Sequence, residues 1–233
     1  MTASSDPDRI RICEVGPRDG LQSEERLWTV EERVDFINRL SGTGLDRIEA
    51  VSFVHPKRVP QMAEAERVMA EINRPDGVSF VGLALNLKGV ERALEAGVDE
   101  VRYVAVASET FSRKNQGASI DESLASFGEI ARTVITSGKK LSGTIGATFG
   151  CPFEGEVPLE KVLDIAGRFA DAGVHEVGLA DTIGCAVPTQ ITERVAAVLD
   201  VIGPDIDLIC HFHNTRNTGL ANAAAAVMAG VRN

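Results

Sequence analysis

The chain has 233 residues, and its 24 lysine and arginine side chains against 34 aspartate and glutamate side chains give a net charge of −10. A hydrophobic share of 44% and a charged share of 25% are those of a globular protein, which excludes disordered and fibrous classes. The acidic balance argues against a nucleic-acid-binding function, because a phosphate backbone needs a basic face. No apolar run approaches the roughly 18 residues of a membrane-spanning helix, so we expect no membrane partner.

Cysteine usage and the start of the chain predict the cellular compartment. The four cysteines are Cys13, Cys151, Cys185 and Cys210, which lie far apart without Cys-x-x-Cys spacing. This pattern is typical of reduced thiols inside a cell. The beginning of the chain has neither the apolar core of a secretory signal nor the Arg-rich, acid-poor composition of a transit peptide. We therefore expect a cytoplasmic protein.

Seven short runs rich in β-branched residues predict strands, and stretches of helical periodicity separate them. The predicted strands are Ile10–Val15, Arg47–Phe53, Val78–Leu85, Glu100–Val106, Leu141–Phe149, His175–Leu179 and Ile206–Phe212. The intervals between them are long enough for the crossover helices that parallel strands require. Local signals mark helix starts in these intervals: Thr29 with Glu32, and Ser119 with Glu122, have the spacing of a capping box.

A short pattern recurs before the second, fourth and sixth predicted strands. It places a glycine between a helix end and a strand start, at Gly44, Gly97 and Gly173, and it begins again at Gly230 shortly before Asn233. Seven strand–helix steps and the opening of an eighth predict an α/β fold, a (β/α)8 TIM barrel truncated at the start of strand eight. We expect residues 1–233 to form one catalytic domain without the last strand and the lid region.

An open, doubly wound sheet is the alternative architecture. Such folds usually carry a glycine-rich phosphate-binding turn after their first strand. The sequence Gly-Pro-Arg-Asp-Gly at 16–20 does not have that pattern. The barrel is therefore favoured.

Catalytic groups of a barrel lie at the carboxyl ends of its strands, where this sequence places two of its four histidines. His211 and His213 form a His-x-His at the end of the seventh strand, and alternate residues of a strand point the same way. Asp19, after the first strand, is the expected third ligand. This donor set predicts a divalent cation, Mg²⁺ or Mn²⁺, with Zn²⁺ less favoured. A hydrogen-bonded pair of core histidines is the alternative.

Other polar residues at the same end have candidate roles. Arg18 could stabilise a developing oxyanion or clamp a carboxylate, or it could be a surface arginine. Glu49 could orient a ligand or Arg18, or close a structural ion pair. Asp181 is either a site residue or the N-cap of the next helix. Further polar side chains in these places are Gln22, Ser52 and Asn115.

Several segments in collinear order carry a family resemblance that covers nearly the whole chain. The first reads Glu-Val-Gly-Pro-Arg-Asp-Gly-Leu-Gln at 14–22. Others are Ser52–Val54, Ala107–Phe111 with Lys114-Asn115, Gly150–Gly155, Asp181–Gly184 and His211–His213. Together they resemble the 3-hydroxy-3-methylglutaryl-CoA (HMG-CoA) lyases, which are metal-dependent TIM barrels related to isopropylmalate and homocitrate synthases.

The resemblance implies a retro-Claisen cleavage that releases acetyl-CoA and acetoacetate. It implies metal ligation by Asp19, His211 and His213, with Arg18 stabilising the enolate oxygen of the departing thioester. Asp181 or His211 would accept the hydroxyl proton. The rest of the pocket would come from Gln22, Glu49, Ser52 and Asn115, with Glu49 and Asn214 supporting the ligands. The implied partners are an acyl-CoA substrate and further copies of the chain, as a homodimer or larger homo-oligomer.

Three departures from the family pattern bear on these expectations. The fourth ligand, an asparagine beyond strand eight, and a glycine-rich loop with a catalytic cysteine do not occur in these 233 residues. Asn214 replaces an aspartate after the His-x-His. In strand five, Ser142 stands before Gly143 where the resemblance predicts an arginine, and Gly178 replaces a polar residue near Asp181. The last two changes affect the expected acyl pocket.

Other functions remain open at this point. A Claisen-type acyl-CoA synthase of the same superfamily would use the same site, although Leu21 after the Arg-Asp-Gly favours the lyase. A metallohydrolase barrel normally has its His-x-His on strand one, and a Schiff-base aldolase would need a lysine where Asp181 ends strand six. The last alternative is a truncated barrel without catalytic activity.

Overall fold

The computed structural model describes residues 9–232, so expectations about the first eight residues and about Asn233 lie outside it. Seven strands form one parallel sheet in sequential order. Their bounds are β1 Cys13–Glu14, β2 Arg47–Ser52, β3 Ser79–Ala84, β4 Glu100–Val106, β5 Lys140–Gly146, β6 Glu176–Asp181 and β7 Asp207–Phe212. The expected truncated TIM barrel is confirmed, and the open doubly wound sheet is excluded by the sequential strand order.

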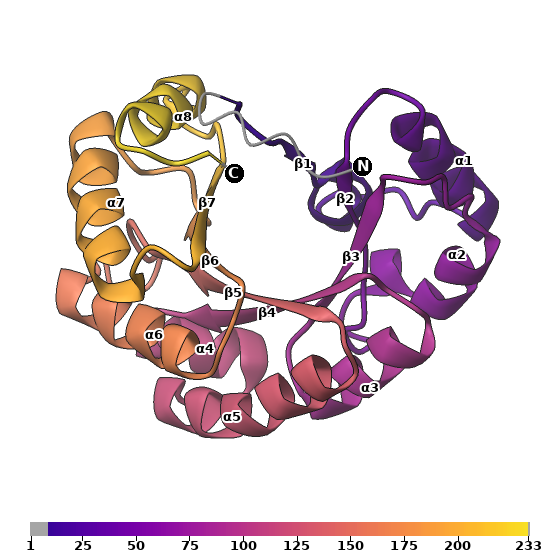
Figure 1. Cartoon of the computed structure of the whole chain (residues 1–233), viewed down its shortest axis with the longest axis horizontal. Helices are drawn as coiled ribbons and strands as arrows, with labels where there is room; N and C mark the ends of the chain where they lie inside the picture. Colours follow the sequence, from indigo (N-terminus) through magenta and orange to yellow (C-terminus); the bar gives the residue numbers. More distant parts are fainter. Residues whose placement is uncertain (1–8, 233) are drawn as a thin grey trace.

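Helices cover the outer face of this curved sheet and form an incomplete ring around it (Figure 1). The α-helices are α1 Val30–Ser41, α2 Ala65–Glu71, α3 Leu87–Glu95, α4 Glu109–Gln116, α5 Ile120–Thr136, α6 Leu159–Asp171, α7 Pro188–Ile202 and α8 Gly219–Met228. A π-helical turn, η1 Gly16–Gly20, follows β1, and a 3₁₀ turn, η2 Pro60–Met62, precedes α2. Within residues 9–232, no helix is both long and apolar enough to cross a bilayer.

The local signals in the sequence are realised with small differences. Both capping boxes form, at the starts of α1 and α5. Gly44, Gly97 and Gly173 all adopt positive φ just before β2, β4 and β6, a conformation that glycine reaches at no steric cost. The fifth strand was predicted too long, because the chain leaves the sheet at Ala147, whose φ of 55° is incompatible with a strand.

The ring is open between β7 and β1, where an eighth strand would lie (Figure 1). Within the described residues β1 pairs with β2 alone, which explains why only two of the six residues predicted there are strand. Two contacts of Arg11 still cross the opening, at the amino end of β7. Arg11 donates its backbone N–H to the carbonyl of Arg232 at 2.7 Å, and its guanidinium contacts Asp207 at 2.7 Å.

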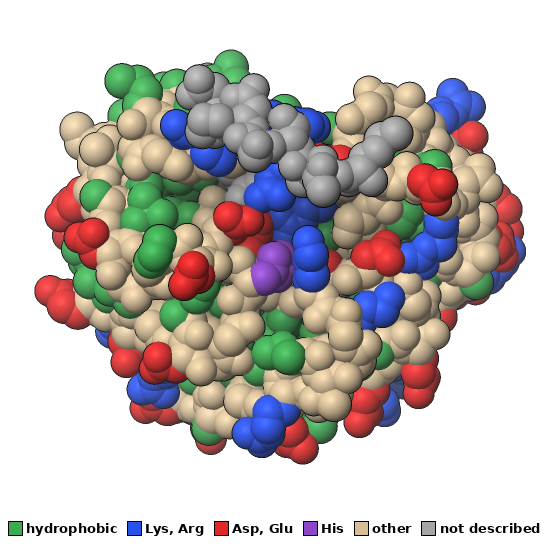
Figure 2. Space-filling model, viewed as in Figure 1, with side chains coloured by type: hydrophobic (Ala, Val, Ile, Leu, Met, Phe, Trp, Pro, Cys, Tyr) green, Lys and Arg blue, Asp and Glu red, His purple; other side chains and the backbone are tan. Residues whose placement is uncertain are grey.

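The two faces of the sheet carry different chemistry. The outer face packs against the helices through apolar side chains, such as Tyr103, whose ring centroid lies 4.9 Å from that of Phe127 and 6.2 Å from that of Phe169. The inner face instead carries charged side chains near the amino ends of the strands: Arg47, Glu49, Glu100, Arg102 and Glu176. Charged side chains of both signs also gather around the hollow at the middle of the face shown in Figure 2. We call Arg47, Glu49, Glu100, Arg102 and Glu176 the ionic layer.

Outer-face packing makes a direct prediction at Gly143 of β5. A Cβ atom added there would lie 2.5 Å from the ring of Phe169, which is fully buried in α6. We expect Gly143→Ala to lower the free energy of unfolding by about 1–3 kcal/mol, because the ring must move in a packed core. In Gly128→Ala the nearest atom would lie 3.9 Å away, within α5, so the higher helix propensity of alanine should raise stability by roughly 1 kcal/mol. Urea unfolding of both variants measures the difference, and equal effects would contradict this description of the packing.

Candidate metal centre and active site

A tight turn after the first strand positions the two residues expected to act there. The chain leaves β1 at Glu14 and enters the π-helical turn η1, in which the backbone N–H groups of Arg18 and Asp19 both donate to the carbonyl of Val15, at 3.1 and 2.7 Å. Such turns are rare and often occur at functional sites. The turn directs both side chains into the hollow of the barrel.

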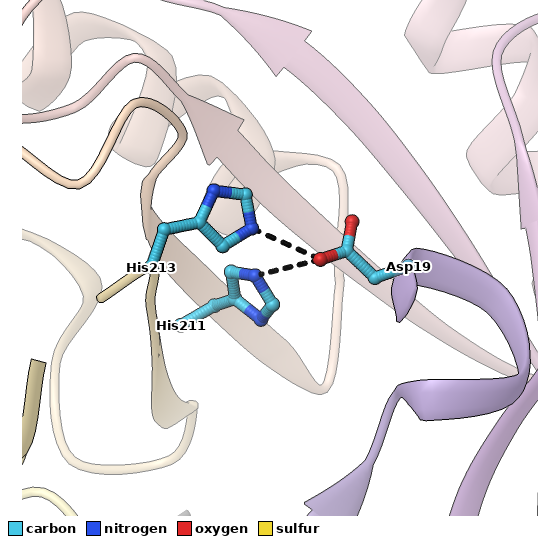
Figure 3. Close-up of side chains that lie close together, drawn as sticks. All are labelled: Asp19, His211 and His213. Atoms are coloured by element: carbon cyan, nitrogen blue, oxygen red, sulfur yellow. Dashed lines mark hydrogen bonds and ion pairs between the residues drawn. The ribbon is translucent and has the colours of Figure 1, made fainter. Parts of the chain in front are cut away.

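The structure brings Asp19 together with the two histidines from the far side of the opening (Figure 3). Oδ2 of Asp19 lies 2.9 Å from Nε2 of His213 and 3.4 Å from Nε2 of His211. Potential ligand atoms of the three side chains all lie within 4.8 Å of one another. Both rings therefore face one carboxylate oxygen, as the His-x-His spacing predicts for a strand end.

Hydrogen bonding specifies how His213 faces this centre. Its Nδ1 lies 2.7 Å from the carbonyl oxygen of Thr182, which can only accept, so Nδ1 carries a proton. Nε2 and a carboxylate oxygen can approach to 2.9 Å only with a proton or a cation between them. The hydrogen bond to Asp19 raises the pKa of His213 above its usual value, against the effect of burial. Burial acts to raise the pKa of Asp19, but hydrogen bonds from His211 and His213 and the charge of Arg18 hold it well below its usual range.

The donor set fits a divalent cation. One carboxylate and two imidazole nitrogens are ligands of the kind that Mg²⁺, Mn²⁺ and Zn²⁺ accept, and the Thr182 carbonyl orients one ring as outer-shell groups do in metal sites. A second group, Glu100, His175 and Glu176, also meets the distance criterion for a metal site. Arg47 and Arg102 already pair with both of its carboxylates, which belong to the ionic layer.

Arg18 lies beside the candidate metal centre and is held by two carboxylates. Its Nη1 lies 2.8 Å from Oδ1 of Asp19, and its Nε donates to Oε1 of Glu49. Glu49 is fully buried, which acts to raise its pKa, but the charges of Arg18 and Arg102 lower the pKa below its usual value. Glu49 was expected either to orient a ligand or Arg18, or to close a structural ion pair. The geometry combines the two, because the ion pair with Arg18 also fixes the direction of its guanidinium.

Asp181 occupies a different position from the one expected of a proton acceptor. It is 1% exposed, and its two carboxylate oxygens accept the backbone N–H groups of Cys185 and Ala186 at 2.9 and 3.0 Å. Of the described residues at the end of β6, Ala180 and Thr182 line the cavity and Asp181 between them does not, because both of its oxygens face the loop. The geometry favours the alternative role, a cap for the loop that leads into α7.

The remaining expected residues divide into two groups. Gln22 and Asn115 line the cavity, as a substrate-binding role requires. Ser52 is fully buried, and within residues 9–232 its hydroxyl has no hydrogen-bond partner. Asn214 also lines the cavity, but its Oδ1 accepts the backbone N–H of Gly219 at 3.0 Å, so it supports the start of α8 rather than a histidine ring.

Two residues that the sequence did not mark as candidates, Thr182 and Arg102, also contribute to the site. Thr182 acts through its backbone carbonyl, which leaves no signal in the side-chain pattern. Arg102 lies inside a run of β-branched and aromatic residues, and its Nε lies 3.3 Å from Oγ of Ser142, its neighbour in register on β5. The resemblance predicts an arginine on strand five at the position of Ser142. In this chain the guanidinium next to that position comes from Arg102 on the neighbouring strand β4. The signal that could have located it is a pair of charges, Glu100 and Arg102, two residues apart on one face of an otherwise apolar strand.

A cavity of about 1460 Å³ extends from this centre into the hollow of the barrel. Arg18, Asp19, His211 and His213 line its mouth. Its wall includes Thr144 and Gly178, where a Cβ added to Gly178 would lie 2.6 Å from the hydroxyl of Thr144. Thr144 therefore occupies the space that a polar residue at position 178 would need.

Comparisons with known proteins agree with this architecture. The family model described as HMGL-like matches residues 9–233. The hydroxymethylglutaryl-CoA lyase of Pseudomonas mevalonii is 42% identical over 96% of this chain and 74% of its own length. The (R)-citramalyl-CoA lyase of Chloroflexus aurantiacus is 41% identical over 97% of this chain and 74% of its own length.

A solved structure gives the same result. The HMG-CoA lyase from Acinetobacter baumannii, solved in complex with coenzyme A and 3-methylmalate, superposes with a TM-score of 0.93 at 41% identity. The match covers all of this chain and 75% of that one. The chain belongs to the HMGL-like family.

Proposed function

We propose that this protein is a metal-dependent carbon–carbon lyase that cleaves an HMG-CoA-like thioester into acetyl-CoA and a 3-oxo acid such as acetoacetate. The observation that carries the proposal is the meeting of Asp19, His211 and His213 at one point, with the Arg18 guanidinium beside them. Relatives at 41–42% identity that are named as acyl-CoA lyases support the reaction class.

The three clustered side chains are the proposed ligands of a divalent cation, Mg²⁺ or Mn²⁺ rather than Zn²⁺. When bound, this cation would lower the pKa of the substrate hydroxyl and fix its orientation. Asp19 supplies the anionic ligand, and His213 offers Nε2 because its Nδ1 proton is committed to Thr182. His211, two residues earlier in β7, supplies the third donor.

Arg18 has the charge and the position to assist the bond-breaking step. In a retro-Claisen cleavage the hydroxyl proton passes to a base, for which water in the cavity is available, and the hydroxyl oxygen becomes the carbonyl of the 3-oxo acid as the Cα–Cβ bond breaks. The electron pair of that bond becomes the enolate of the departing thioester, which takes up a proton to give acetyl-CoA. In that enolate, negative charge appears on an oxygen that was neutral in the substrate. A guanidinium fixed beside the cavity accelerates the step because it stabilises charge that develops only as the bond breaks.

His211 was a candidate for two roles that one nitrogen cannot perform at once. Its Nε2 faces the oxygen of Asp19 that His213 also contacts, which favours the ligand role. Asp181, the other candidate proton acceptor, has both oxygens bound by backbone N–H groups. We assign His211 to the metal centre and Asp181 to the adjoining loop.

The acyl group is the open part of the substrate assignment. HMG-CoA itself is the first choice, and Gln22 and Asn115 are the proposed polar contacts. The relatives named above as lyases of HMG-CoA and of (R)-citramalyl-CoA are almost equally similar to this chain, so a related 3-hydroxyacyl-CoA is the nearest alternative. The synthase reaction in the reverse direction would use the same centre, and Leu21 is the feature that favours cleavage.

We further propose that the chain acts as one catalytic domain. Its sheet is continuous from β1 to β7 within the described residues. The four cysteines are all free thiols, which supports a reducing compartment such as the cytoplasm. Assembly into a homodimer or larger homo-oligomer stays a prediction.

An acetyl-CoA release assay on the full-length protein tests the proposed function. We expect HMG-CoA, or another thioester from a series of 3-hydroxyacyl-CoA compounds, to be cleaved with Mg²⁺ or Mn²⁺ present. Activity should disappear in EDTA and return on addition of the cation, and Asp19→Ala should abolish it. Cleavage that survives EDTA would overturn the metal role, and no cleavage of any thioester by metal-loaded protein would overturn the function.

Metal titration of His211→Ala and His213→Ala tests the assignment of the two rings. If both are ligands, each variant should lose affinity for Mn²⁺ by at least roughly 10- to 100-fold in calorimetry, the loss that removal of a mere outer-shell partner causes. If His211 is instead the proton acceptor, His211→Ala would bind Mn²⁺ like the wild type and lose only turnover. Asn214→Ala is the matched control, because this neighbour supports α8 and should leave Mn²⁺ affinity unchanged.

A further inference from the structure

Two arginines share the buried carboxylate of Glu49. Oε1 accepts from Nε of Arg18, and Oε2 accepts from Nη1 of Arg102 at 2.5 Å. Glu49 is fully buried on β2, so water cannot replace either partner. The orientation of this carboxylate is therefore determined by both guanidinium groups.

Arg102 is itself held by partners on two other strands. Its Nε lies 3.3 Å from Oγ of Ser142 on β5, and its Nη2 lies 3.3 Å from Oε1 of Glu176 on β6. Only 6% of the residue is exposed. A planar guanidinium bound in several directions cannot swing, so the acceptor geometry that it imposes on Glu49 is rigid.

The charges explain why Arg102 is needed for Glu49. Arg18, Arg47 and Arg102 are balanced by Glu49, Glu100 and Glu176, and each carboxylate contacts two arginines. Without Arg102, Glu49 would keep Arg18 as its one cationic partner, and its two oxygens would compete for that guanidinium. The Nε of Arg18 would then lose its fixed acceptor. Only the contact of Nη1 with Asp19 would still orient this guanidinium.

We propose that Arg102 is a positioning residue for Arg18, acting through Glu49. It holds the far oxygen of this carboxylate so that the near oxygen aims the Arg18 guanidinium at the reacting end of the cavity. The inference rests on the proposed function, in which Arg18 stabilises the developing enolate. Displacements of about 1 Å in such groups can cost roughly 100-fold in rate.

Arg47 provides a matched comparison for a purely structural role. It belongs to the same ionic layer and pairs with Glu100 and with Glu176, but it makes no contact with Glu49. Loss of either arginine leaves buried carboxylates with fewer partners and should lower stability. A positioning role distinguishes them, because it predicts an effect on Arg18 from Arg102 alone.

The first experiment compares Arg102→Met, Arg102→Lys and Arg47→Met in the full-length, metal-loaded enzyme, with Arg18→Met as the reference. We expect Arg18→Met to lower kcat by roughly 100- to 1000-fold, as for the loss of one oxyanion donor. Arg102→Met should lower kcat at least about tenfold with KM within threefold, because Arg18 acts in the transition state. Arg102→Lys should recover part of this loss, since a single cation can still bind Oε2, and Arg47→Met should keep kcat within about threefold of the wild type.

A second readout does not depend on activity. The ¹⁵N–¹H signal of Arg18 Nε, assigned by its absence in Arg18→Met, should shift or broaden in Arg102→Met and stay unchanged in Arg47→Met. Wild-type kcat in Arg102→Met, or equal losses in Arg102→Met and Arg47→Met, would overturn the proposal. If Arg102→Met does not fold, Arg102→Lys decides the question: a lowered kcat with a shifted Arg18 signal supports positioning, and an unchanged kcat and signal overturn it. A shifted signal in a protein that cleaves no thioester would support the positioning and reject the proposed function.

Discussion

The carboxylate of Asp19 connects the two ends of the curved sheet at the place where the ring is open. One side of the opening supplies the aspartate from the turn after β1, and the other supplies two imidazoles from the end of β7. Within the described residues, no strand bridges these two sides. The geometry of the candidate metal centre therefore depends on how the curvature of seven strands brings first and last together, and every chemical role proposed here depends on that meeting.

The interior of the barrel has two levels with different tasks. Near the amino ends of the strands, the ionic layer ties β2, β4 and β6 together through buried arginine–glutamate pairs. Near the carboxyl ends, Arg18, Asp19, His211 and His213 line the cavity. Glu49 connects the levels, because it accepts from Arg102 below and from Arg18 above. Buried ion pairs contribute little net stability on average, so orientation of a reactive arginine is a physical reason for their presence here.

The residues of the candidate metal centre follow a simple periodic rule and are therefore predictable from the sequence. Parallel strands end at one edge, and alternate residues share a face, so His211, His213 and Asp19 could be placed together without coordinates. Asp181, at the end of β6, was expected at the same centre, but both of its oxygens accept backbone N–H groups of the following loop, a contact that strand alternation does not predict. The length of β1 was overestimated because strand pairing, rather than local composition, determines where a strand persists.

The residue roles that the sequence does not reveal depend on contacts between distant segments. Arg102 appears in the sequence as a charge two residues after Glu100 in an otherwise apolar strand, and its role depends on Glu49, which precedes it by 53 residues. Thr182 contributes a backbone carbonyl, which any residue type could provide. Asn214 was expected to support a histidine, but it accepts a hydrogen bond from the start of α8, five residues later. Register and backbone geometry decide such roles, and neither can be read from residue type.

The most direct test of the central claim is an anomalous difference map from a crystal of the full-length protein soaked in Mn²⁺. The account predicts one strong peak within bonding distance of Oδ2 of Asp19 and Nε2 of both His211 and His213, at roughly 2.0–2.3 Å. A peak elsewhere in the barrel, or three side chains that remain hydrogen-bonded to one another at saturating Mn²⁺, would contradict it.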